Sequence, residues 1–183
     1  LAGDSLLTLA FDILADPATH DDAAVRCALV LSMARASGVG GMAGGQMLDL
    51  AAERTGLTVG EVERLQAMKA GALIRGACEC GAIRAGAGAA ETAALLQYGE
   101  AAGRAFQLAD DLLDVTQSTE VLGKQAAKDA DRGKATLLSL LGEEESRRLA
   151  DRLVAEACAA LEPFGQKGRW LKETARFIVG RDR

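Results

Sequence analysis

The segment from Phe106 to Asp114 reads Phe-Gln-Leu-Ala-Asp-Asp-Leu-Leu-Asp and predicts a helix, because it lacks Gly and Pro and its apolar residues recur at helical spacing. Four polar residues at i, i+3, i+4 and i+7 share one broad face of that helix: Gln107, Asp110, Asp111 and Asp114. Like charges at such spacing weaken an isolated helix by roughly 0.2–0.5 kcal/mol per pair. A hard divalent cation would offset this repulsion. Mg²⁺ typically takes one or two carboxylates together with substrate phosphate oxygens.

The polar stretch after this helix contains two lysines, Lys124 and Lys134, each directly preceded by a glycine. A lysine ammonium is a compact charge on a flexible stem, and two of them there would suit a phosphate group. The commonest fate of an acidic cluster is a solvated helix face, and that alternative needs no ligand. The lysines that follow favour the metal-and-phosphate interpretation.

Two polar positions earlier in the chain are further candidates. Gln46 and Asp49 are three residues apart on a predicted helix, so both can face one cavity. Lys69 lies within an apolar stretch that should face the core. A lysine in such a place must reach solvent or meet an anion, and we favour the anion.

The run from Phe106 to Thr136 resembles the second aspartate-rich region of the trans-isoprenyl diphosphate synthases, which include farnesyl and geranylgeranyl diphosphate synthases. Further segments resemble motifs of this family in the same order: LAGDSLL at 1–7, GGQMLD at 44–49, KAGALI at 69–74 and RFIVGRDR at 176–183. The resemblance therefore spans nearly the whole chain. Ala70 stands where the family usually has Thr, and the lost hydrogen bond to a diphosphate is worth about 0.5–1.5 kcal/mol. Ala127 stands where bacterial members often have Gly.

The resemblance implies a prenyltransferase that condenses isopentenyl diphosphate with an allylic diphosphate, dimethylallyl or geranyl, into a short all-trans prenyl diphosphate. Farnesyl diphosphate is the first expectation for the product, and geranylgeranyl diphosphate is the alternative. Three Mg²⁺ ions are expected in the intact enzyme. The resemblance assigns metal ligands (Asp110, Asp111 and Asp114), catalytic residues (Lys69, Gln107, Asp110 and Lys124) and substrate-binding residues (Gln46, Lys69, Gln107, Lys124 and Lys134).

In the family, a first aspartate-rich motif and a basic Gly-Lys-Arg segment precede the part that residues 1–7 resemble. We therefore expect residues 1–183 to be the C-terminal part of one polyprenyl synthase domain, without its N-terminal helices and inactive alone. One alternative is a non-catalytic regulatory or scaffold homologue that lacks the first motif. Another is a class I terpene cyclase, although its Asn/Ser/Glu metal motif and aromatic cavity fit poorly with an all-Asp motif and 3% aromatic residues.

Composition fits an all-α single domain, and the resemblance implies a helical bundle of the isoprenoid synthase type. The chain is 49% hydrophobic, carries a net charge of −5 and contains two prolines and one histidine. The mild acidity argues against nucleic acid as a partner, and no apolar run approaches the roughly 20 residues of a membrane span. We expect a cytoplasmic protein, and the resemblance implies a homodimer. Helices are expected at 4–15, 21–37, 42–55, 59–85, 89–117, 136–141, 143–164 and 167–179.

Overall fold

The computed structural model describes residues 1–52, 56–122 and 136–181, and for 116–122 only the backbone. Within these ranges the chain forms helices and no strand, so the all-α prediction is confirmed. The α-helices are α1 (Ala2–Ala15), α2 (Ala23–Ser37), α3 (Met42–Ala52), α4 (Val59–Gln66), α5 (Ala72–Ala85), α6 (Ala89–Leu122), α8 (Leu137–Leu141), α9 (Glu143–Ala160) and α10 (Arg169–Gly180). A π-helical segment, η1 (Ala67–Gly71), joins α4 to α5, and a 3₁₀ segment, η3 (Glu162–Gly168), joins α9 to α10.

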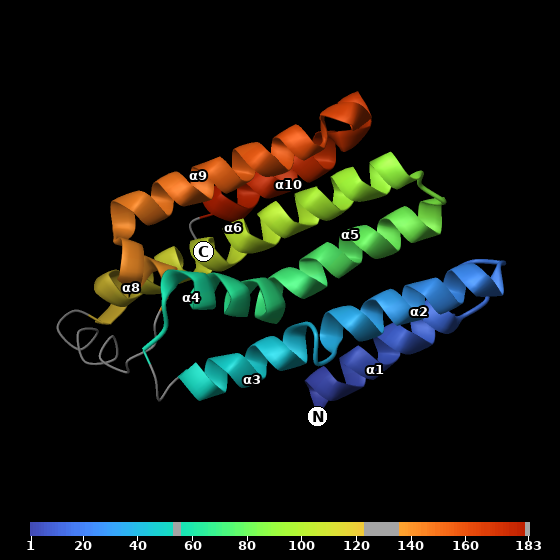
Figure 1. Cartoon of the computed structure of the whole chain (residues 1–183), viewed down its shortest axis with the longest axis horizontal. Coiled ribbons are helices and arrows are strands. Elements are labelled where there is room, and N and C mark those ends of the chain that lie inside the picture. The colour runs from blue at the N-terminus through green and yellow to red at the C-terminus, as the bar shows by residue number, and fades with distance from the viewer. Residues whose placement is uncertain (53–55, 123–135, 182–183) are drawn as a thin grey trace.

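The longer helices lie side by side (Figure 1). Helix α1 packs on α2, α2 on α5, α5 on α6, and α6 on both α9 and α10. Helices α2, α5, α6, α9 and α10 each bury residues on the side that faces their neighbours, as expected for amphipathic helices in a bundle, whereas α1 buries none. Arg181, the last described residue, directly follows α10 and contacts Asp110 of α6, 71 residues earlier in the sequence.

The largest apolar core lies where α6 meets α9 and α10. Small side chains of α6 fill it, among them Ala101, Ala102 and Ala105, each at most 5% exposed. The Tyr98 hydroxyl donates a hydrogen bond of 2.9 Å to the carbonyl oxygen of Leu171, which fixes α10 on this helix. A buried tyrosine hydroxyl usually has a hydrogen-bond partner, as here. Burial raises the pKa of Tyr98 to about 12.

On its opposite side, α6 comes very close to η1 and α5 because glycines face them. A Cβ atom on Gly103 would lie 2.8 Å from the Cα of Gly71, and one on Gly99 would lie 2.8 Å from the Cα of Arg75. Side chains larger than hydrogen are therefore excluded at both positions. This close approach brings the α6 face with Gln107 beside the π-helical segment that contains Lys69.

The main difference from the sequence-based prediction is in the expected helix at 59–85. The structure divides it into α4, η1 and α5, with Lys69 at the centre of the π-helical turn. A π turn inserts one extra residue, and such bulges occur frequently at functional sites. The hydrophobic pattern averages over many turns, so it does not reveal one extra residue. The helix expected at 89–117 also continues, to Leu122.

Among the described residues, one stretch is long and apolar enough to meet a membrane-span criterion, namely Ala23–Ala52 with a mean hydropathy of 1.2. It comprises α2, α3 and the break between them at residues 38–41. This stretch differs from the prediction that no apolar run approaches the length of a membrane span. It is weak evidence for a span, because core helices and signal sequences have the same length and composition.

Candidate functional site

The acidic face of α6 contains one carboxylate held by two amides. Asp111 accepts hydrogen bonds from Gln107 Nε2 at 3.1 Å and from Gln66 Nε2, on α4, at 2.9 Å. Burial raises the pKa of the Asp111 carboxyl above its usual value; the two amide bonds oppose this, and the charges of Asp114 and Asp110 add to it. The side chain is thus oriented by neighbours and, as a carboxylate, incompletely compensated in charge.

The neighbouring carboxylate, Asp110, lies against the C-terminal end of the described chain. Arg181 donates a hydrogen bond from Nη2 to Asp110 Oδ1, and its guanidinium lies 4.6 Å from the centre of the Phe106 ring. Burial raises the pKa of Asp110, while Arg181 lowers it and the charge of Asp114 raises it further. Asp114, one turn further along α6, is exposed.

Lys69 meets an anion within the protein. Its Nζ donates to Asp49 Oδ2 of α3 at 2.6 Å, and Asp49 is only 8% exposed. Gly45 permits this contact, because a Cβ there would lie 2.4 Å from the backbone nitrogen of Lys69. Gln46, on the same helix as Asp49, is exposed, so the two side chains have different surroundings.

The structure brings together the three helical elements that carry the predicted site residues within the described ranges. Helix α6 carries Gln107 and the three aspartates, η1 with Lys69 packs against it, and α3 packs against η1. Gln66 was not predicted as a site residue, although it bonds Asp111. Asp49 was a candidate from its spacing to Gln46 and had no assigned role; it bonds Lys69. Lys124 and Lys134 lie outside the described residues.

The carboxylates of α6 fit a cation that shares its shell with a ligand. Across residues 1–52, 56–122 and 136–181, no three acidic, histidine or cysteine side chains converge closely enough to enclose a metal. Mg²⁺ is commonly bound by one or two carboxylates, while water and phosphate oxygens complete its octahedral coordination. The charge on Asp110 and Asp111, which burial destabilises, would be relieved by such a cation. The donor set is therefore compatible with Mg²⁺.

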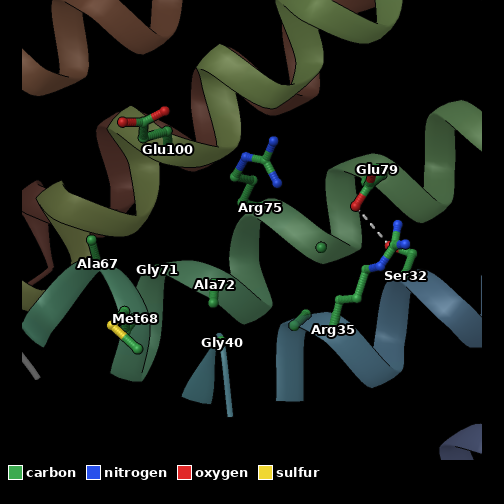
Figure 2. A pocket seen from close by; sticks show the side chains of 12 residues that line it. Ser32, Arg35, Gly40, Ala67, Met68, Gly71, Ala72, Arg75, Glu79 and Glu100 are labelled. Carbon is green, nitrogen blue, oxygen red and sulfur yellow. Dashed lines mark hydrogen bonds between the residues drawn. The ribbon is translucent and has the colours of Figure 1, made fainter. Parts of the chain in front are cut away.

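A cavity of about 410 Å³ lies between α2, η1, α5 and α6 (Figure 2). Small and apolar side chains line part of it, together with four charged residues: Arg35, Arg75, Glu79 and Glu100. Glu79 accepts a hydrogen bond of 2.8 Å from Ser32 Oγ, across α5 and α2. Met68, next to Lys69 in η1, reaches the wall. Local spacing does not predict this cavity, because its charged residues come from three separate helices.

The structure is an all-α bundle in which a helix with three aspartates packs against the element that carries Lys69, and this donor set is compatible with a divalent cation. Comparison with known families agrees with this description. A family model described as polyprenyl synthetase matches residues 1–162, and the chain belongs to that family.

Named relatives are similar along the full chain. Farnesyl diphosphate synthase of Escherichia coli (strain K12) is 40% identical over 190 residues, which cover 100% of this chain and 63% of the relative. Geranylgeranyl diphosphate synthase of Cyanophora paradoxa is 36% identical and is covered to 61% of its length, with 100% of this chain matched. The chain thus spans about three fifths of the length of these relatives.

Solved structures show the same fold. An FPP/GFPP synthase from Zymomonas mobilis superposes with a TM-score of 0.84 at 41% identity, covering 98% of this chain and 60% of that one. A geranyltransferase from Helicobacter pylori, complexed with magnesium and isoprenyl diphosphate, superposes with a TM-score of 0.77 at 27% identity, covering 97% of this chain and 57% of that one.

Proposed function

We propose that the full-length protein is a Mg²⁺-dependent prenyltransferase that joins isopentenyl diphosphate to an allylic diphosphate. The observation that carries this proposal is the packing of the acidic face of α6 against the π turn that holds Lys69. Farnesyl diphosphate is the proposed product and geranylgeranyl diphosphate the alternative, because relatives of both names match this chain to similar extents.

In the proposed reaction, Asp110 and Asp114 would hold the Mg²⁺ that binds the allylic diphosphate. Asp111, which is oriented by hydrogen bonds from two glutamines, would support them through its negative charge. Bound Mg²⁺ supplies Lewis-acid stabilisation of the departing diphosphate. Lys69 offers its ammonium protons to diphosphate oxygens, while Asp49 holds that ammonium group in place. Gln107 orients the Asp111 carboxylate through its hydrogen bond of 3.1 Å. Donors positioned in advance of the reaction are usually the largest source of rate enhancement.

The proposed overall chemistry is a condensation of the two substrates. The allylic carbon–oxygen bond breaks, and the double bond of isopentenyl diphosphate attacks the allylic carbon. Loss of one proton then leaves a product that is longer by one five-carbon unit, with diphosphate as the other product. Lys124 and Lys134, beyond the described residues, are proposed to add positive charge around the leaving group.

The test is an assay of the full-length protein with labelled isopentenyl diphosphate, geranyl diphosphate and Mg²⁺. We expect a prenyl diphosphate whose formation stops when the metal is chelated. Residues 1–183 alone are expected to give no turnover. Failure of the full-length protein with every allylic primer would refute the synthase proposal and leave a non-catalytic homologue as the better explanation.

We also propose a homodimer. Helix α1 has no buried residue, and it exposes large apolar side chains, with Leu6 at 66% and Ile13 at 54% exposure. Large apolar side chains exposed along one helix often mark an interaction site. Analytical ultracentrifugation of the full-length protein should show a dimer, and Ile13→Glu should weaken it. A monomer at all concentrations would contradict the proposal.

A further inference from the structure

Arg181 makes an unusual set of contacts for a residue directly after the last helix. One guanidinium nitrogen bonds Asp110, and the guanidinium plane lies over the Phe106 ring. The side chain is only 17% exposed. Its Nε is buried and has no hydrogen-bond partner among the described residues. A buried, unsatisfied guanidinium nitrogen costs free energy, so Arg181 is only partly stabilised where it lies.

We propose that Arg181 is a positioning residue that neutralises Asp110 in the metal-free protein and is displaced when the divalent cation binds. This inference rests on the proposed function, in which Asp110 is a metal ligand. Arg181 lies at one oxygen of the carboxylate that a metal would bind at about 2.0–2.1 Å. Two cations on one carboxylate repel each other strongly at such separations. Metal binding and the Asp110–Arg181 pair therefore oppose each other.

The rest of α10 does not depend on this pair. Ala175 and Ile178 are buried in the core, and the carbonyl oxygen of Leu171 accepts the hydrogen bond of Tyr98. Displacement of Arg181 would therefore free Gly180 and Arg181 while leaving the rest of the helix in place, because Val179 also packs against the core. The cation would act on the C-terminus through Asp110, so metal occupancy and C-terminal order would be coupled.

Coupling of two binding events is reciprocal, so Arg181 must lower the metal affinity by the factor by which the metal weakens the Arg181 contact. The test uses full-length protein, inorganic diphosphate and Mn²⁺, with free Mn²⁺ measured by electron paramagnetic resonance. Arg181→Gln should bind Mn²⁺ more tightly than wild type, by up to about fivefold, and Arg181→Lys should fall between them. Arg176→Gln, an exposed arginine on α10, is the matched control and should be unchanged.

A structural role alone would predict the opposite sign, because loss of a stabilising contact weakens a site. Equal or weaker Mn²⁺ binding by Arg181→Gln would overturn the inference and leave the proposed function intact. Absence of Mn²⁺ binding by wild type would instead refute Asp110 as a metal ligand, and both proposals would fail.

Hydrogen–deuterium exchange provides a second readout that does not depend on turnover. In wild type, Mn²⁺ should accelerate exchange in the peptide that contains Ile178 to Arg181. In Arg181→Gln this peptide should exchange fast with or without metal, while a peptide from α9 stays protected in both proteins. Metal-independent exchange at the C-terminus of wild type would contradict the displacement.

Discussion

Replacement of Asp110 by alanine separates catalysis from folding. The Asp110 side chain is 37% exposed, so its pair with Arg181 is screened by solvent and contributes only about 0–1 kcal/mol. Burial of the charged carboxylate costs free energy, as its raised pKa shows, and the substitution removes this cost, which offsets part of that loss. We therefore expect the melting temperature of metal-free Asp110→Ala to change little.

The effect on turnover should be much larger. Loss of a direct Mg²⁺ ligand removes several kcal/mol of stabilisation from the departing diphosphate, and about 3–5 kcal/mol corresponds to roughly 10²–10⁴ in kcat. The loss should be greater in kcat than in KM, because the metal acts more strongly on the transition state than on bound substrate.

The assay is steady-state kinetics of the full-length variants at saturating Mg²⁺, with melting followed by circular dichroism. Asp151→Ala, which removes an exposed aspartate of α9, is the matched control and should retain wild-type kinetics. A kcat of Asp110→Ala within about threefold of wild type, with an intact fold, would show that the acidic face of α6 is only a solvated surface.

Three further outcomes are expected. Lys69→Gln should raise KM for the allylic diphosphate about tenfold in steady-state kinetics, with partial rescue by Lys69→Arg; an unchanged KM would contradict a diphosphate contact. Asp111→Asn should have a higher melting temperature than wild type near neutral pH, and this difference should vanish as the pH falls. The reason is that a carboxyl whose pKa is raised in the folded protein contributes stability at low pH, and this stability is lost as the pH rises through that pKa. A difference in melting temperature that does not change with pH would argue against burial as the cause. Gly45→Ala should lower the melting temperature by roughly 2–10 °C through its clash with the Lys69 backbone, whereas Gly60→Ala, with open space at Cβ, should not; similar melting of both would refute the close packing.

The sequence alone determined the helical character of the chain and the shared face of Gln107, Asp110, Asp111 and Asp114. Both are local properties, since the period of the helix places residues three and four apart on one side. The chemistry suggested for that face follows equally from residue types and spacing. The ordered motifs along the chain carried the family resemblance, which the family match confirmed.

The tertiary structure alone decided which partners meet this face. Gln66 is 45 residues from Asp111 and Arg181 is 71 residues from Asp110, so no local pattern connects either pair. Their contacts depend on how closely helices approach, and glycines facing a neighbouring backbone set that approach. The π turn at Lys69 adds one residue that periodicity averages away. Spacing along a helix is a property of the chain itself, whereas contacts between helices come from the packing of the whole bundle.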